Sequence, residues 1–549
     1  MSPNKPEERA DYPAPDNEPS TRPLPRRLHP RFYYAALLLV ILLVAGIRFH
    51  LRTMPLERDE GEYAYAGQLI LQGIPPYTLA YNMKLPGTYT AYAAIMAVFG
   101  QSSTGIRLGL ILVNAAAIIL VFLLAQKLAG PVNGSLTGFA AGTTYALLSN
   151  LPSLLGFAGH ATHFVVLFAV AGILVMLRAL NARGGPLLFF CSGFLLGIAF
   201  LTKQPGIAFA AFGALYIARC SWKQPRLMAS REAAYFVGVA LPFAVTCLSL
   251  AHAAVFQNFW FWTFTYAREY SSETSLKVAG QALRQSLQWT MHPFPLWAIA
   301  EIGLVTLVWN RRWRPQLFFL ATFTAFSLLA VCSGFYFRPH YFILFLPAAS
   351  ILAALAVSSA YRFLAQRRFR ANARLVPVVI FIVACAFSLW DQRAFLFEFD
   401  PAAAAQKIYA ANPFAEAVAA ARTVRASTTE TDTIAVFGSE PEIYFLSARH
   451  SATSYVYMYD LIKTQPYQLQ MRNEMIRQIE SARPRIVIYV DDWASWGWRR
   501  GQEHDEFFTW MENYIHRNYE PVEQMQINAQ PAHRWGEAAN LYIFRRTAP

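Results

Sequence analysis

The sequence has few charged residues for its length. Only 15% of its 549 residues are charged, whereas 55% are hydrophobic and 15% are aromatic. These proportions exclude an ordinary soluble enzyme. The net charge of +14 could indicate a nucleic-acid-binding protein, but the positions of the basic residues favour a membrane topology.

Cysteine is also scarce. All five cysteines fall in or beside apolar segments, at Cys191, Cys220, Cys247, Cys332 and Cys385. Without a CxxC pair, the pattern excludes a disulfide framework and a cysteine metal centre. The C-terminal region likewise lacks the GxGxxG and GxxxxGKS motifs of phosphate-binding loops.

Long apolar runs with few charges are frequent and indicate bilayer-spanning helices. The pattern predicts eleven spans, of which the fifth and sixth are short for full crossings: 33–50, 105–126, 135–152, 162–180, 187–202, 205–219, 234–254, 294–309, 316–335, 341–360 and 375–392. The expected fold class is a polytopic α-helical membrane protein, with a transmembrane domain over residues 33–393.

Basic residues are concentrated in alternate loops of this predicted topology. They are Arg26, Arg27, Arg31, Lys127, Arg178, Arg183, Arg219, Lys223, Arg226, Arg231, Arg311, Arg312, Arg314, Arg362, Arg367, Arg368, Arg370 and Arg374. The positive-inside rule therefore predicts a cytoplasmic N-terminus and, after an odd number of spans, an extracytoplasmic C-terminal region. Residues 1–32, polar and aperiodic, are expected to form a disordered cytoplasmic tail.

The region 394–549 alternates predicted strands and helices, which favours a small α/β domain. Strands are expected at 433–438, 454–459, 485–492 and 540–546, with helices between them. Three tryptophans, Trp493, Trp496 and Trp498, lie in one turn of this domain. They are typical of a membrane-interface contact, and an aromatic platform for a sugar or acceptor is the alternative.

An acidic group follows the first span, in the predicted outer loop 51–104. Asp59, Glu60 and Glu62 stand at the start of a predicted amphipathic interfacial helix over 60–72, which Gly73 ends. In this frame Asp59 is the N-cap and Glu62 is the N3 partner of a capping box. Capping does not explain Glu60, or the single cation Lys84 downstream.

A transfer reaction explains all four residues. A carboxylate just outside the bilayer can accept a proton from an acceptor hydroxyl or amine. A cation at the same depth can neutralise the phosphate of a lipid-linked donor. The loop therefore predicts sugar transfer from a lipid-linked phosphosugar.

The stretch RDEGEYAYAGQLILQGIPPY, followed by NMKLPGTYTAY, resembles the first extracytoplasmic loop of the GT-C glycosyltransferases. Within them it is similar to the bacterial protein O-mannosyltransferase and aminoarabinose-transferase-like group. The resemblance implies a GT-C transmembrane domain and an extracytoplasmic α/β domain. It also implies that Asp59 is the catalytic base, that Glu60 supports it or contacts the acceptor and that Lys84 holds the polyprenyl phosphate. Glu62 stands where the aminoarabinose transferases have arginine, so the sugar and acceptor are not implied.

Other outer residues are candidates for the same site. Arg338, Lys203 and Arg268 could contact the donor phosphate, and the alternative for Arg338 and Lys203 is snorkelling to the interface. Glu62, Tyr63, Tyr77 and His340 are candidate substrate-binding residues. His160 and His163 have i, i+3 spacing, but no acid is near them in sequence, so neither a metal site nor another cofactor is predicted.

The predicted activity is inverting transfer of a monosaccharide from a polyprenyl-phosphate donor to a lipid, glycan or protein at the outer face of the plasma membrane. A flippase for lipid-linked sugars is the first alternative, but it predicts internal repeats and charges at the midplane. An oligosaccharide ligase or polymerase is the second. A membrane-anchored binding protein is the third, and it leaves the acidic loop unexplained.

Overall fold

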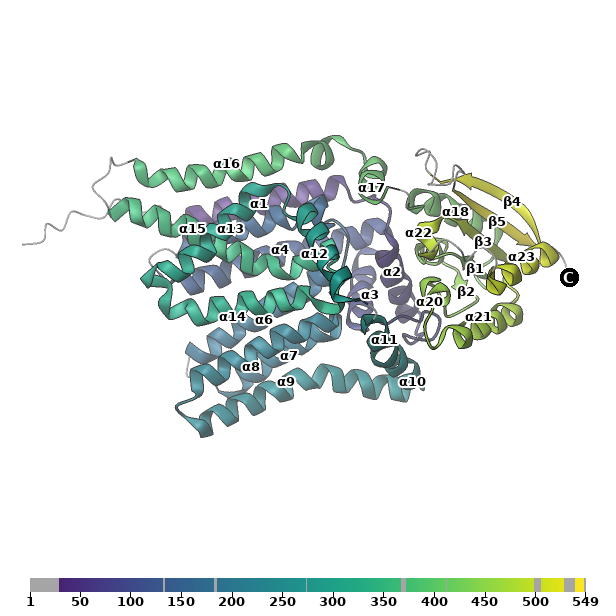
Figure 1. Cartoon of the computed structure of the whole chain (residues 1–549), viewed down its shortest axis with the longest axis horizontal. Helices are drawn as coiled ribbons and strands as arrows, with labels where there is room; N and C mark the ends of the chain where they lie inside the picture. Colours follow the sequence, from purple (N-terminus) through teal and green to yellow (C-terminus); the bar gives the residue numbers. More distant parts are fainter. Residues whose placement is uncertain are drawn as a thin grey trace, which may run out of the picture.

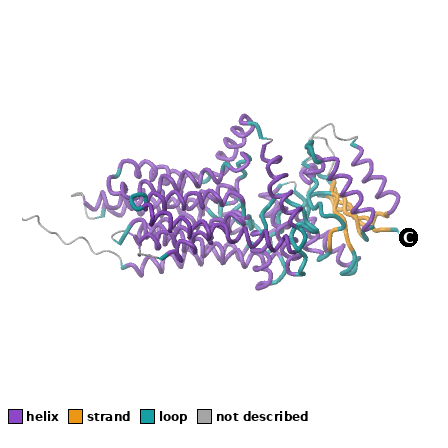
Figure 2. Tube along the Cα trace, turned by 90° about the horizontal axis from the view of Figure 1, so that it is seen from below, coloured by secondary structure: helices purple, strands orange, loops and turns teal. Residues whose placement is uncertain are grey.

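The computed structural model describes residues 29–131, 134–181, 185–272, 274–366, 372–410, 412–497, 505–527 and 539–547. Figure 1 shows a bundle of long helices at one end of the molecule and a small α/β domain at the other. Figure 2 shows that the strands are confined to that second end. The predicted fold class is confirmed. Most of the predicted tail, residues 1–28, lies outside the described residues.

A helix lies at each of the eleven predicted spans. They are α1 (Pro30–His50), α4 (Ser103–Ala129), α5 (Gly134–Leu148), α6 (Ala161–Asn181), α7 (Pro186–Thr202), α8 (Ile207–Ser221), α9 (Pro225–His252), α13 (Phe294–Trp309), α14 (Arg314–Val331), α15 (Leu346–Gln366) and α16 (Val376–Asp391). Within the described residues, seven helices are long and apolar enough to cross a membrane, and an eighth span forms if α12 (Leu276–Thr290) and α13 count as one bent crossing. The number of crossings stays a prediction.

Burial separates the central helix of the bundle from the peripheral ones. The most apolar window of the span that ends in α15 is 89% buried, compared with 22% for α1, α9 and α16. The peripheral helices α1, α9 and α16 therefore present their apolar side chains to lipid. Helices α7 and α9 pack closely through Gly193, Gly197 and Gly238, where a Cβ would meet the backbone of the facing helix, as is common between membrane helices.

Short elements join the long helices at both ends of the bundle. They are α2 (Arg58–Leu71), α3 (Gly87–Phe99), η1 (Pro152–Leu154), η2 (Gln204–Gly206), α10 (Phe256–Trp260), η3 (Phe261–Tyr266), α11 (Ala267–Ser272), η4 (Arg311–Trp313), η5 (Ser333–Phe335), η6 (Pro339–Phe345), η7 (Ala373–Leu375) and η8 (Ala394–Glu398). Helix α2 was expected to lie on the membrane surface, and this expectation is wrong. Its residues 60–69 are all buried, because it is packed between α3 and α19 (Glu442–Ser447).

The C-terminal domain contains one five-stranded sheet in the order β2-β1-β3-β5-β4. Its strands are β1 (Thr433–Phe437), β2 (His450–Ser451), β3 (Ile486–Asp491), β4 (Tyr519–Gln526) and β5 (Asn540–Arg546), and its other helices are α17 (Pro401–Tyr409), α18 (Phe414–Ser427), α20 (Tyr459–Ile462), α21 (Gln468–Ala482), α22 (Trp493–Trp496) and α23 (Glu506–Asn518). β1 is parallel to β2 and β3, with Val436 opposite Ile488. β5 is antiparallel to β3 and β4.

One strand prediction in this domain is wrong, and the strands β2 and β4 were missed. The segment 454–459 is not a strand, because part of its backbone bonds elsewhere: Ser454 O accepts from Tyr81 N at 2.7 Å. The edge strand β4 was not predicted, since it is polar and contains Pro521, features that are tolerated at a sheet edge.

The tryptophan turn does not form one surface. Trp496 is buried, and its Nε1 donates to Val490 O at 2.7 Å. Trp493 is 57% exposed, and Trp498 lies outside the described residues. Trp496 is therefore a core residue, and neither the interface contact nor the sugar platform applies to it.

Apolar clusters cross the boundary between the two domains. One of them includes Tyr63 and Tyr65 of α2 and Tyr89 of α3, together with Ile434 of β1 and Tyr444 of α19. The C-terminal domain is therefore packed directly on α2, the helix that carries the acidic residues.

Candidate functional site

Helix α2 begins two residues earlier than predicted. Glu57 is the N-cap: its Oε1 accepts from Glu60 N at 2.9 Å, and Glu60 Oε2 accepts from Glu57 N at 3.2 Å. This is a complete capping box. The prediction that Asp59 and Glu62 form the cap is wrong, because Glu57 already occupies that position. The carboxylate of Asp59 is therefore available for another role.

Lys84 lies between two of the predicted acids. Its Nζ donates to Asp59 Oδ1 at 2.8 Å and to Glu62 Oε2 at 2.5 Å. Glu62 also accepts from the hydroxyl of Tyr89 at 2.5 Å, and the Tyr63 ring centroid is 4.6 Å from Nζ. Asp59, Glu62 and Lys84 are called the ion-pair cluster below.

The loop before α3 holds the backbone of Lys84. The Tyr77 hydroxyl donates to Lys84 O at 2.8 Å, and Asn258 Nδ2 donates to Tyr77 O at 3.2 Å. Tyr77 is buried and has a φ of 66°, a left-handed conformation that is uncommon for an aromatic residue. The predicted substrate residues Tyr63 and Tyr77 thus surround Lys84.

Electrostatics keeps this cluster charged at Asp59 and Lys84. Burial raises the pKa of Asp59, but the positive charge of Lys84 outweighs it and holds that pKa well below its usual range. Burial opposes the charge of Lys84, yet Asp59 and Glu62 raise its pKa well above normal. For Glu62 the effect of burial is larger than the opposing effects of Lys84 and Tyr89, so its pKa is raised. At neutral pH Asp59 is therefore a carboxylate beside a lysine cation.

Glu60 occupies a different environment from Asp59. It is fully buried, and Arg107 binds both of its oxygens, with Nη2 at 2.8 Å from Oε2. Gly159 N donates to Oε1 at 2.5 Å. These contacts fix the first turn of α2 to α4 and to the loop before α6, which supports a structural role for Glu60 next to Asp59.

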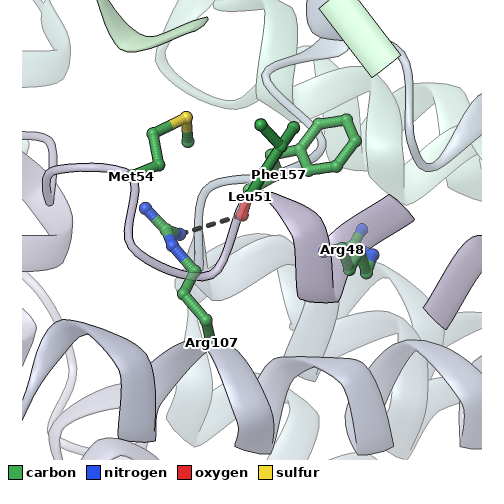
Figure 3. Close-up of a pocket in the computed structure, with 5 residues that line it drawn as sticks. All are labelled: Arg48, Leu51, Met54, Arg107 and Phe157. Carbon is green, nitrogen blue, oxygen red and sulfur yellow. Dashed lines mark hydrogen bonds between the residues drawn. The ribbon is translucent and has the colours of Figure 1, made fainter. Parts of the chain in front are cut away.

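Figure 3 shows the surroundings of Arg107, whose guanidinium also donates to Phe157 O at 2.9 Å. Arg107, Arg48, Leu51, Met54 and Phe157 line a cavity of about 10 Å³, roughly the size of one water molecule. Arg48 donates to Ser149 O at 3.0 Å and to Gly156 O at 2.7 Å. Both arginines are therefore structural supports of the loop that carries His160.

Two further cations are close enough to affect the ion-pair cluster. Lys203 Nζ lies 4.1 Å from the Tyr341 ring centroid. Burial lowers the pKa of Lys203 to about 7; Asp59 opposes this shift, and Lys84 and Arg338 add to it. Asp59 likewise stabilises the charged form of Arg338 and raises its pKa. Lys84, Lys203 and Arg338 are thus all coupled electrostatically to Asp59, and their contact with a donor phosphate stays a prediction. Arg268 is exposed on α11 and is not a leading contributor to these shifts.

Two histidines from distant segments complete the site. His160 and His340 stack with ring centroids 3.9 Å apart, and His160 Nδ1 lies 4.0 Å from Asp59 Oδ2. Burial lowers the pKa of His160 to about 3, so its ring is neutral. His163, the other histidine of the GHATH segment, is not part of this stack, because the fold pairs His160 with His340.

Asp59, His160 and His340 could hold a metal ion, since one ligand atom from each lies within 4.8 Å of the other two. Nδ1 of both imidazoles is buried and has no hydrogen-bond partner among the described residues. The sequence did not indicate this grouping, because the acid is far from both histidines along the chain.

The C-terminal domain reaches the same site. Arg58, next to Asp59, forms an ion pair with Glu440 at 2.6 Å and donates to Asn412 Oδ1 at 3.1 Å. Tyr457 donates to Arg58 O at 3.1 Å and to Asp59 Oδ1 at 3.2 Å. Sequence reasoning missed these residues, because no local pattern links them to α2.

The fold and the site define a class of protein. A bundle of apolar helices, an acidic helix at its outer end and an α/β domain packed on that helix form the GT-C architecture. The described helices and the C-terminal sheet agree with it throughout.

Comparisons with known proteins agree with this class. Residues 85–256 match the family of dolichyl-phosphate-mannose-protein mannosyltransferases. The chain is 26% identical over 277 residues to an undecaprenyl phosphate-alpha-4-amino-4-deoxy-L-arabinose arabinosyl transferase of Pseudomonas paraeruginosa. That alignment covers 48% of each protein, so the chain spans about half the length of the curated relative it matches.

Solved structures share the fold over most of the chain. ArnT from Cupriavidus metallidurans bound to undecaprenyl phosphate has a TM-score of 0.54 at 15% identity, covering 93% of this chain and 98% of that one. The archaeal oligosaccharyltransferase AglB from Archaeoglobus fulgidus, in complex with an inhibitory peptide and a dolichol-phosphate, has a TM-score of 0.51 at 13% identity, with 93% and 74% covered. At these identities the likeness shows the GT-C fold.

Proposed function

We propose that this protein is a membrane glycosyltransferase that moves a monosaccharide from a polyprenyl-phosphate donor to an extracytoplasmic lipid, glycan or protein. The observation that carries the proposal is the ionised Asp59 paired with Lys84, with Lys203 and Arg338 nearby. The family match at residues 85–256 and the relative that acts on an undecaprenyl-phosphate sugar support the same class of donor.

Asp59 is assigned the role of general base. Its Oδ1 accepts from Lys84, while Oδ2 faces His160, so Oδ2 is placed to take a proton from an acceptor hydroxyl or amine. The acceptor oxygen or nitrogen then forms a bond to C1 of the sugar as the bond from C1 to the phosphate oxygen breaks. A single displacement of this kind inverts the anomeric configuration.

Lys84, Lys203 and Arg338 are assigned to the donor phosphate. The phosphate leaves as a polyprenyl phosphate anion, and cations placed where charge develops lower the barrier. A phosphate that arrives beside Lys84 competes with Asp59 for its ammonium group. Because Lys84 is what depresses the pKa of Asp59, this competition makes Asp59 a stronger base when donor is bound.

The proposed site requires a defined topology. We place the N-terminus in the cytoplasm and residues 394–549 outside the plasma membrane, on the side of α2. An alkaline phosphatase fused after Pro549 should be active in a bacterial host. An inactive phosphatase, with an active cytoplasmic reporter at the same position, would contradict both the topology and the site.

Reconstitution of the purified protein tests the activity. Proteoliposomes supplied with polyprenyl-phosphate monosaccharides and extracted envelope acceptors should transfer the labelled sugar and release polyprenyl phosphate. The product should have the opposite anomeric configuration to the donor, as measured by NMR. Retained configuration would contradict the single displacement, and the absence of transfer from every donor would contradict the proposed function.

A further inference from the structure

The segment between β2 and α20 brings a tyrosine of the extracytoplasmic domain to Asp59. Tyr457 is 7% exposed. Its hydroxyl lies 3.2 Å from Asp59 Oδ1, and its ring centroid lies 5.4 Å from Lys84 Nζ. One side chain from the C-terminal domain therefore touches both members of the Asp59–Lys84 pair.

Contacts along α2 hold this segment in register. Beside the Arg58–Glu440 ion pair, the Tyr65 hydroxyl accepts from Ser451 N at 2.8 Å. At Gly61 the helices α2 and α19 approach so closely that a Cβ on Gly61 would lie 2.6 Å from Glu442 N. The position of Tyr457 relative to Asp59 is therefore set by the docking of the whole domain.

We propose that Tyr457 is a positioning residue for Asp59, so that the extracytoplasmic domain completes the catalytic site. The inference rests on the proposed function, in which Asp59 is the base. Tyr457 and Lys84 both donate to Oδ1, and they orient the carboxylate with Oδ2 toward His160 and the acceptor.

The role of Tyr457 becomes larger when donor binds. A phosphate that draws Lys84 away removes one of the two donors to Oδ1. The one hydroxyl hydrogen of Tyr457 is shared between Asp59 Oδ1 and Arg58 O, which lies 3.1 Å away in the same helical turn. The hydroxyl therefore keeps its place beside Asp59, and the carboxylate keeps its orientation when Lys84 is drawn away.

Removing the Tyr457 hydroxyl tests the inference. Tyr457→Phe should lower kcat about ten- to a hundred-fold, the usual effect of losing a hydrogen bond to a charged group, with KM for the donor within about twofold. A loss in kcat without a change in KM is the signature of a misplaced Asp59 carboxylate, because donor binding is left intact.

Another buried tyrosine of the same domain provides the matched control. The Tyr519 hydroxyl donates to Pro484 O at 2.9 Å, so Tyr519→Phe removes a comparable hydrogen bond away from Asp59. It should leave kcat unchanged. Equal effects from the two variants would overturn the positioning role and assign Tyr457 to domain stability alone.

A double-mutant cycle separates positioning from folding. If Tyr457 acts through Asp59, Tyr457→Phe should have no further effect on the residual rate of Asp59→Asn, whereas independent contributions would multiply. This readout also applies if Tyr457→Phe lowers protein yield, because rates are compared per folded enzyme. Failure of the wild type to transfer sugar would contradict the proposed function, whereas additive losses would contradict the inference alone.

Discussion

Replacing Lys84 should separate its structural role from its role toward phosphate. The ammonium contacts Glu62 at 2.5 Å and Asp59 at 2.8 Å, and the exposed fractions of the three side chains are 25% for Lys84, 30% for Asp59 and 0% for Glu62. Breaking a buried pair costs about 3–5 kcal/mol, whereas an exposed pair contributes about 0.2–1 kcal/mol. Because Glu62 is buried while Lys84 and Asp59 are partly exposed, we expect Lys84→Met to lower the free energy of unfolding by about 2–3 kcal/mol.

The stability loss should come from Glu62, because its charge is left buried and unpaired. Lys84→Met combined with Glu62→Gln removes that charge, and the amide oxygen can still accept from the Tyr89 hydroxyl. Thermal unfolding in detergent should therefore show a lower apparent Tm for Lys84→Met and a largely restored Tm for the double variant.

Phosphate binding should follow a different pattern. Loss of one charge-assisted contact weakens affinity by about 10- to 100-fold, so the single and the double variant should both bind undecaprenyl phosphate poorly. Lys127→Met, at the exposed end of α4, should change neither quantity. Recovery of both stability and affinity in the double variant would refute the two separate roles of Lys84. Binding of undecaprenyl phosphate by Lys84→Met at the wild-type affinity would refute its role toward phosphate.

Two further predictions concern the domain interface and Lys203. Gly61→Ala places a Cβ 2.6 Å from Glu442 N, so it should destabilise docking by about 1–3 kcal/mol and make the C-terminal domain more sensitive to limited proteolysis. Gly46→Ala is the control, because nothing lies within 4 Å of a Cβ at Gly46, and it should leave the protease sensitivity unchanged. Equal protease resistance of the two variants would show that the interface accommodates the Cβ at position 61. Because burial holds the pKa of Lys203 at about 7, its charge is present below that pH and lost above it, so undecaprenyl phosphate should bind more weakly at pH 8.5 than at pH 6. Lys203→Arg should bind with a flatter pH profile, and an unchanged pH dependence in that variant would place the titrating group elsewhere.

Local sequence patterns predicted the fold class because hydrophobic length and turn signals act over a few residues. The helices at all eleven predicted spans, the stop at Gly73 and the strands β1, β3 and β5 depend on such patterns. The start of α2 was misplaced by two residues, since aspartate is a preferred N-cap residue and glutamate is not, and the N-cap at Glu57 depends on Glu60, which tertiary contacts hold in place.

Long-range contacts explain what the sequence could not predict in the site. Lys84 was predicted because it is the single cation of its loop after the acids, 25 residues from Asp59. Tyr457 lies 398 residues from Asp59, and Arg107 lies 47 residues from Glu60. Nothing in their neighbouring residues distinguishes them from core or interface side chains. His340 was a candidate, but its stacking on His160 depends on the packing of η6 against the loop before α6.

Asp59→Asn tests the central claim most directly. Glu57 caps α2, so the substitution should leave the helix, the membrane insertion and the protein level unchanged. Losing base catalysis costs about 10²-fold or more in rate, and the variant should transfer sugar at least that much more slowly in proteoliposomes supplied with donor. Asp400→Asn, at the N-cap of α17, preserves a cap and should transfer at the wild-type rate. Transfer by Asp59→Asn at a near wild-type rate would contradict the assignment of Asp59 as the catalytic base.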